Sequence, residues 1–108
     1  MITIDKIVDY YNKRCLKRPN AEEAILFAMT ELGEATDLLL TGVGGWLRNN
    51  TKEPYTPERF GEELGDVIMM LMAAGMAAGV DPLDCLEAKI DRKLSQLSQQ
   101  ENKNASNA

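Results

Sequence analysis

Two pairs of acidic residues have the type and spacing that suit metal chemistry. Glu31 and Glu34 form the first pair, and Glu63 and Asp66 form the second, each at an i, i+3 separation. At about 100° per residue, such a separation puts both side chains on one side of a helix. Each pair can therefore direct two carboxylates toward one point.

Apolar residues surround both pairs. Phe27 and Leu38 lie one turn before and one turn after the first pair, and Met70 follows the second by one turn. We therefore expect the four carboxylates to enter a buried seam between two helices. Ionised carboxylates are not buried without compensation, and a hard divalent cation with oxygen-only ligands supplies it. This donor set suits magnesium or manganese.

The competing interpretation of the acidic pairs is a solvated face with i, i+4 salt bridges. Neither pair has a Lys or Arg four residues later, which weakens it, but from the pattern alone both interpretations stay open. A di-iron bundle needs Glu-x-x-His motifs, and the chain has no histidine. The same absence removes Ser-His and Cys-His nucleophiles and histidine-bound zinc.

Helix signals surround these acids, and no strand pattern competes with them. Asn20 with Glu23 forms a capping box, Thr56-Pro57 starts a later helix, and Asp81-Pro82 starts another. The expected helices run from about Ile4 to Lys17, from Asn20 to Thr41, from Thr56 to Ala78 and from Asp81 to Ser98. In the last helix, we expect Leu86, Ile90, Leu94 and Leu97 to face inward.

The whole chain fits one small all-α domain. Its 108 residues are divided into an expected domain at 1–98 and a disordered polar tail at 99–108. A net charge of −5 argues against nucleic acid and anionic membrane as partners. The longest uncharged stretch has 14 residues, where a membrane span needs about 20. With no signal peptide visible and two unclustered cysteines, Cys15 and Cys85, we expect a reduced cytoplasmic protein.

The two acidic motifs resemble those of the MazG-like nucleotide pyrophosphohydrolases. The matching stretches are Thr-Glu31-Leu-Gly-Glu34-Ala and Glu62-Glu63-Leu-Gly-Asp66-Val, with 28 residues between Glu34 and Glu63. That superfamily also includes the all-α dUTPases, dCTP pyrophosphatases and phosphoribosyl-ATP pyrophosphohydrolases. The resemblance covers roughly residues 4–97.

The resemblance implies a four-helix bundle-like MazG fold and magnesium-dependent cleavage between the α- and β-phosphates of a nucleoside triphosphate. It implies Glu31, Glu34, Glu63 and Asp66 as metal ligands. It also implies a homotetramer, built as a dimer of dimers, or a homodimer, with the active site between helices of paired subunits. Thr30 stands where many members have Glu, and the stretch Lys89-Ile-Asp91-Arg92-Lys93 lacks an Asn that many have.

Further residues have expected roles in binding and catalysis. Lys89, Arg92 and Lys93 form a basic stripe that suits the outer phosphates, the alternative being a solvated flank. Trp46, in a Gly-rich loop, suits base stacking, or else anchors the loop or a subunit interface. Glu34 and Glu63 are the expected catalytic carboxylates, with Glu34 as proton acceptor. A non-catalytic nucleotide or metal sensor and a purely structural helical oligomer are the alternatives to an enzyme.

Overall fold

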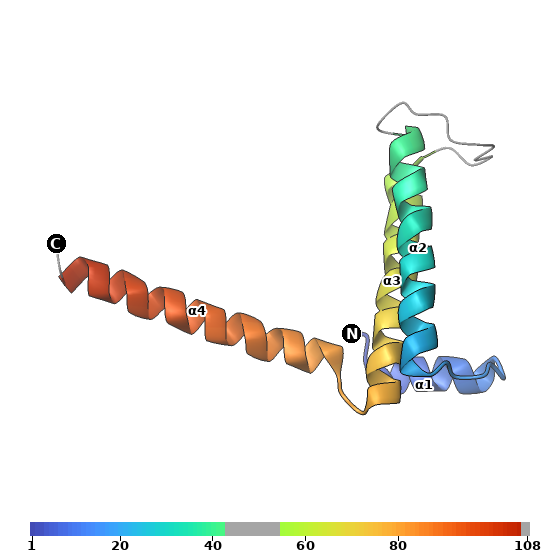
Figure 1. Ribbon diagram of the computed structural model, residues 1–108, viewed down its shortest axis with the longest axis horizontal. Coiled ribbons are helices and arrows are strands. Elements are labelled where there is room, and N and C mark those ends of the chain that lie inside the picture. The colour runs from blue at the N-terminus through green and yellow to red at the C-terminus, as the bar shows by residue number, and fades with distance from the viewer. Residues whose placement is uncertain (43–54, 107–108) are drawn as a thin grey trace.

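The computed structural model describes residues 1–42 and 55–106, and in these ranges the chain folds into helices without any strand. The prediction of an all-α protein is therefore confirmed. The helices are α1 (Ile4–Lys13), α2 (Ala21–Gly42), α3 (Pro57–Ala78) and α4 (Pro82–Ser106). Figure 1 shows that α2 and α3 form an antiparallel hairpin, with α1 and α4 at its lower end.

The helix starts lie where the capping residues predict them. The Glu23 backbone N–H donates to Asn20 Oδ1 at 2.8 Å, and the Asn20 N–H donates to Glu23 Oε1 at 3.0 Å. Thr56 Oγ1 accepts from the Arg59 N–H at 3.1 Å, and Asp81 Oδ1 accepts from the Leu83 N–H at 2.9 Å. These bonds satisfy amides that have no partner inside the helix.

The predicted end of α1 at Lys17 is wrong, because the helix ends at Lys13. Cys15 adopts a left-handed conformation with φ of 53°. The Leu16 N–H then donates to the Tyr11 carbonyl at 3.0 Å, and the Cys15 N–H donates to that of Asn12 at 3.1 Å. This pair of bonds is a Schellman motif, which glycine usually forms. Because no glycine marks the position, the sequence gives no signal for it.

Small side chains hold α2 and α3 close together. On α2 the buried residues Ala24, Ala28, Ala35 and Leu38 recur at spacings of four, seven and three along one side. On α3, Ala73 and Ala74 are buried opposite Ala24 in one cluster. Alanine lets two helix backbones approach, so the hairpin contact is tight but leaves little room for large side chains.

Helix α1 crosses the lower part of the hairpin and packs on α3 (Figure 1). Ile7 and Tyr11 are 5% exposed and form a cluster with Met72, which is 1% exposed. This cluster is the main apolar contact between α1 and α3. It fixes the position of Tyr11 beside the hairpin.

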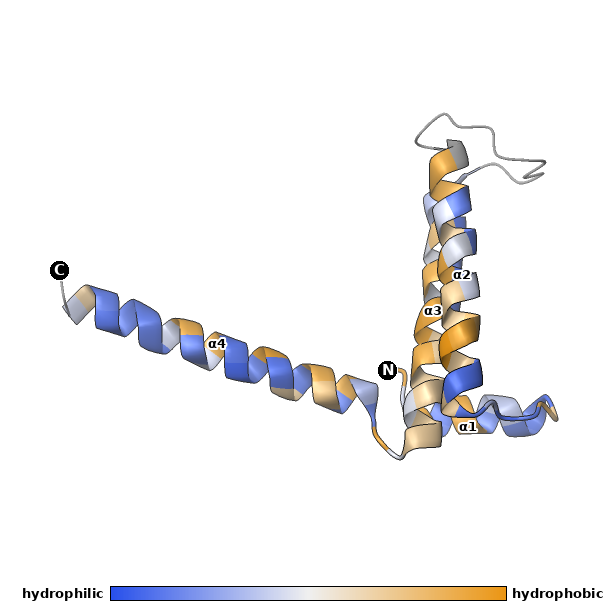
Figure 2. Ribbon diagram, viewed as in Figure 1, coloured by the Kyte–Doolittle hydropathy of each residue, from blue (hydrophilic) through white to orange (hydrophobic). Residues whose placement is uncertain are grey.

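Helix α4 leaves the hairpin instead of packing along it, with a bend of 98° between α3 and α4. Among residues 1–42 and 55–106, its only contact with another helix is with α3. The expectation that Leu86, Ile90, Leu94 and Leu97 face inward is therefore wrong for this chain, since they are 48 to 56% exposed. Figure 2 shows α4 as a mostly hydrophilic helix with hydrophobic segments along it. A single chain does not build a four-helix bundle.

The expected end of the last helix at Ser98 is also wrong. α4 continues past Ser98 to Ser106. Residues 99–106 contain no Gly or Pro, and Gln, Glu and Lys are good helix formers. Their polarity predicted disorder, but polarity alone does not end a helix.

Two properties bear on membrane insertion. Among residues 1–42 and 55–106, no single helix has the length and apolar character to cross a bilayer. Only α3 and α4 taken together, across their 98° bend, reach the required length and composition.

Candidate metal centre and adjoining pocket

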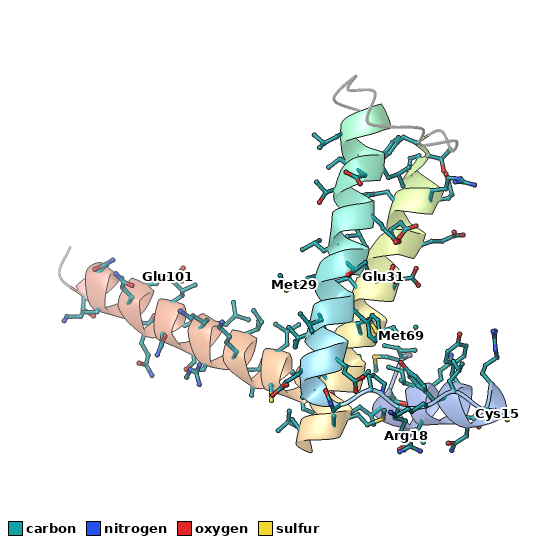
Figure 3. The ribbon with its side chains drawn as sticks, turned by 45° about the vertical axis from the view of Figure 1, so that its right-hand side comes forward. Cys15, Arg18, Met29, Glu31, Met69 and Glu101 are labelled. Carbon is teal, nitrogen blue, oxygen red and sulfur yellow. The ribbon has the colours of Figure 1, made fainter. Side chains whose placement is uncertain are left out.

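Three of the four predicted acids meet near the middle of the hairpin. One carboxylate oxygen from each of Glu31, Glu63 and Asp66 lies within 4.8 Å of the other two. Glu31 and Glu63 are half-buried and Asp66 is exposed. Figure 3 shows Glu31 at mid-height on α2, on the side where α3 lies.

The helical register puts the two half-buried acids inside the contact between α2 and α3. Glu31 occupies the same row as Ala28, Ala35 and Leu38, all of which are buried. Glu63 begins the matching row on α3, which continues through half-buried Met70. Glu63 Oε2 is shielded from solvent. Glu31 and Glu63 therefore interrupt an apolar seam and are not simply solvated, whereas Glu34 and Asp66 are exposed. The expectation that all four carboxylates enter a buried seam is wrong for these two.

The electrostatics at Glu31 reflect this crowding. Burial raises the pKa of the Glu31 carboxyl above its ordinary value, because desolvation disfavours the charged form. The negative charges of Glu34, Asp66 and Glu63, together with a side-chain hydrogen bond to Glu34, raise the pKa further. The four carboxylates thus act on one another even though the chain draws them from two helices.

Glu34 differs from the other three acids. It is exposed, as Asp66 is, but its oxygens are not part of the three-residue group within 4.8 Å. It nevertheless lies close enough to Glu31 to share a hydrogen bond. Glu34 therefore stands at the solvent edge of the cluster.

The donor set suits a hard divalent cation. Carboxylate oxygens bind magnesium at about 2.0–2.1 Å and calcium at about 2.3–2.6 Å, so ligands of one ion lie at most about 4–5 Å apart. The 4.8 Å limit among Glu31, Glu63 and Asp66 lies within the span of about 5.2 Å for calcium and is somewhat wider than the span of about 4.2 Å for magnesium. Small side-chain rotations would bring the three oxygens to one ion, which would also offset the repulsion among them.

A pocket adjoins the carboxylates, and Glu31 belongs to both. Its volume is about 430 Å³, within the range of about 300–1,000 Å³ that small-molecule sites occupy. Its walls come from α1, from the segment that follows α1 and from the hairpin. The lining residues are Tyr11, Leu16, Lys17, Pro19, Glu23, Phe27, Glu31 and Met70.

Most of this pocket was not predicted from the sequence. Phe27 was placed on the acidic side of α2 by its spacing from Glu31, but Tyr11, Leu16, Lys17 and Pro19 were not expected there. They reach the pocket because α1 crosses α3 and because the chain leaves its helix at Lys13. The sequence carries no local signal for long-range packing of this kind. It shows only that α1 has an aromatic residue, Tyr11, on the face that is buried.

The chain does not bring its basic stripe to its own carboxylates. Lys89, Arg92 and Lys93 are exposed on α4, which does not contact α2 and contacts α3 only at the junction. Their predicted role in phosphate binding therefore stays a prediction. Trp46 lies outside the described residues.

Comparisons with protein-family models, curated proteins and solved structures found no match for this chain. The likeness to the MazG-like enzymes therefore rests on the two acidic motifs.

Proposed function

We propose that the protein is a magnesium-dependent pyrophosphohydrolase that converts a nucleoside triphosphate to a monophosphate and pyrophosphate. The observation that carries the proposal is the shared position of Glu31. This residue belongs to the carboxylate group within 4.8 Å and also lines the 430 Å³ pocket. A ligand with an apolar ring at one end and phosphates at the other matches that combination.

In the proposed site, Glu31, Glu63 and Asp66 would hold the cation. Glu34 would either be a fourth ligand or act as a base at the edge of the cluster. Manganese is an alternative to magnesium because it prefers the same oxygen donors. The nucleobase or sugar lies against Tyr11, Phe27 and Met70, which form the aromatic and apolar part of the pocket.

The proposed reaction is attack of water on the α-phosphorus. The bond from that phosphorus to the oxygen bridging the β-phosphate breaks, and pyrophosphate leaves. Glu34 accepts the proton that the attacking water loses, a role supported by its exposure at the edge of the cluster. Magnesium at this site would screen the phosphate charge and lower the pKa of bound water.

The outer phosphates need positive charge, and in the proposed site Lys89, Arg92 and Lys93 supply it. Since α4 points away from the carboxylates of its own chain, the proposal assigns this role to α4 of a second copy. Lys17 supplies another positive charge within the same chain, since it lines the pocket beside Glu31. The reaction is proposed to take place in the cytoplasm, where Cys15 and Cys85 would stay free thiols.

The test is a panel of common and modified nucleoside triphosphates, with the release of both pyrophosphate and monophosphate measured. We expect equal amounts of the two products with magnesium and neither product after chelation. The matched control pair is Glu63→Gln, within the cluster, and Glu62→Gln, its exposed neighbour. Only Glu63→Gln should be inactive.

Two outcomes would contradict the proposal in different ways. Binding of nucleotides with magnesium but without pyrophosphate release from any of them would indicate a sensor. If magnesium changes neither the melting temperature nor nucleotide binding, the cluster is not a metal site, and the chain is a structural helical protein.

A further inference from the structure

The pocket beside the carboxylates has two distinct ends along α2. Three of its lining residues come from this helix at intervals of four, namely Glu23, Phe27 and Glu31. Residues four apart lie one above the other on the same side of a helix. Between Glu23 and Glu31 the helix rises by about 12 Å, which is comparable with the length of a nucleotide from its α-phosphate to the far edge of its base. Glu31 belongs to the carboxylate cluster, so Glu23 marks the opposite end of the pocket.

The middle of the pocket is aromatic and apolar. Phe27 lies between the two acids in the sequence of α2, and Tyr11 of α1 and Met70 of α3 line the same space. Tyr11 is 5% exposed and packs with Ile7 and Met72, so its ring is held in a fixed position. Aromatic rings offer faces on which a planar base can stack, and such stacking accepts every base. Any choice among bases therefore depends on the polar groups at the ends of the pocket.

The carboxylate of Glu23 is held in place through one oxygen and is open at the other. Its Oε1 accepts from the Asn20 N–H at 3.0 Å, and the Glu23 N–H donates to Asn20 Oδ1 at 2.8 Å. Within residues 1–42 and 55–106, Oε2 of Glu23 has no hydrogen-bond or ion-pair partner. The capping box thus fixes the side chain before any ligand arrives, so binding through Oε2 costs little further rotamer freedom.

We infer that Glu23 selects nucleotides whose base carries an amino group at the ring position farthest from the sugar, which is C4 of a pyrimidine or C6 of a purine. The inference rests on the proposed function, which puts the phosphates at the cluster of Glu31 and the base against Tyr11 and Phe27. A nucleotide bound in this way along α2 points the far edge of its base toward Glu23.

The hydrogen-bonding groups of the bases decide the direction of this preference. An ionised carboxylate only accepts hydrogen bonds. Cytosine and adenine carry an amino group at this position, which donates to the open Oε2 of Glu23. Uracil, thymine, guanine and hypoxanthine carry a carbonyl oxygen there, which cannot donate and is repelled by the carboxylate. Because losing a hydrogen bond to a charged group weakens binding at least about tenfold, Glu23 alone is sufficient for a clear preference.

The test compares kcat/KM for pyrophosphate release within two pairs of substrates that differ in this group, cytidine against uridine triphosphate and adenosine against inosine triphosphate. We expect the wild type to favour the amino member of both pairs at least about tenfold. In Glu23→Gln the ratio should fall close to one, because a Gln amide both donates and accepts, while Gln keeps the capping box. The matched control is Glu22→Gln, since Glu22 is an exposed neighbour that does not line this pocket, and it should keep the ratio of the wild type.

A wild-type ratio close to one in either pair, with pyrophosphate released, would overturn the inference and leave the proposed function standing. So would a preference that Glu23→Gln retains, since another residue would then choose the base. Each ratio compares two substrates on the same protein, so a less stable variant still gives a valid answer. If no nucleotide releases pyrophosphate, the proposed function fails. The affinities for cytidine and uridine monophosphate, measured by calorimetric titration, then decide, and equal affinities would overturn the inference as well.

Discussion

Glu31 occupies a position in α2 that alanine fills one turn earlier and one turn later. At the scale of single residues, this is the main conflict in the protein, because the helix contact favours a small apolar side chain there. Desolvation and the charges of Glu34, Asp66 and Glu63 raise the pKa of its carboxyl. Glu31 therefore opposes folding when it is ionised and no cation is bound.

The first prediction concerns the pH dependence of stability. The raised pKa means that folded Glu31 holds its proton to higher pH than unfolded Glu31 does. Its contribution to stability is fully present below the unfolded pKa and is lost as the pH rises through the folded pKa. Without divalent cations, Glu31→Gln should raise the melting temperature at pH 7, and this gain should shrink at a pH below the ordinary range of Glu. Glu62→Gln is the control and should show no such trend.

The second prediction concerns magnesium. Glu63→Gln and Asp66→Asn should abolish pyrophosphate release and the rise in melting temperature on adding magnesium, because each removes a ligand and a negative charge. Both variants should stay folded and should be at least as stable as the wild type in a chelator. Near-normal turnover of either variant at saturating magnesium would show that these carboxylates are not the catalytic centre.

The acidic residues were predictable from the sequence because their helical spacing sets which side chains share a face. Glu31 and Glu63 lie in the apolar contact that Phe27, Leu38 and Met70 predicted. The exposed positions of Glu34 and Asp66 were not predictable, since spacing does not fix how deeply a side chain enters a seam.

At the scale of helices, capping residues predicted where three of the helices begin. Packing, which residue spacing does not encode, determined where α1 ends and in which direction α4 runs. Asn20, Thr56 and Asp81 each accept the expected hydrogen bond. The predictions for the end of α1 and for the inward-facing packing of α4 were wrong. The first depends on a cysteine in a left-handed conformation, and the second on contacts at a junction three residues long.

The third prediction tests that junction. A Cβ at Gly75 would lie 2.5 Å from two atoms of the Pro82 ring and 2.8 Å from the Val80 carbonyl oxygen, neither of which moves easily. Gly75→Ala should therefore cost about 1–3 kcal/mol of stability through overpacking. Gly61 on the same helix has no such neighbour within 4 Å, so Gly61→Ala should stabilise by about 0.5–1 kcal/mol. Urea denaturation compares the two, and equal effects would refute the close packing at the junction.

At the scale of the whole molecule, the chain is extended, with principal dimensions of 59 × 39 × 24 Å. This shape follows from α4, which leaves the hairpin (Figure 1). Both the basic residues Lys89, Arg92 and Lys93 and the apolar residues of α4 are exposed. The sequence predicted amphipathic character in α4 but not its partner, because an apolar stripe fits a neighbour in the same chain and one in another chain equally well.

The fourth prediction follows from the distance between α4 and the carboxylates of the same chain. If Lys89 and Arg92 hold the outer phosphates of a substrate bound to another copy, Arg92→Ala should weaken triphosphate binding at least tenfold and monophosphate binding much less. A chain with Glu63→Gln and a chain with Arg92→Ala should each have little activity alone.

Mixing these two chains under exchange conditions should restore part of the activity, because one pairing combines an intact cluster with an intact stripe. If the mixture does not recover activity and Arg92→Ala weakens the binding of both nucleotides equally, the basic stripe on α4 is a solvated flank and does not bind phosphate. The mixture of Glu63→Gln with Asp66→Asn is the control and should stay inactive, since both changes affect the same cluster.

The acidic seam in the hairpin has a consequence for how long the protein survives. A ligand that binds only the folded chain increases its stability by mass action, and the proposed ligand is a cation at the centre of the helix contact. If the proposed site binds magnesium and nucleotide, scarcity of either should make the hairpin open more often and expose backbone to proteases. The steady-state amount of the protein would then follow the supply of its proposed ligands, without any dedicated regulator. Pulse-chase measurements of wild type and Glu31→Gln under magnesium starvation would reveal this coupling as a difference in half-life.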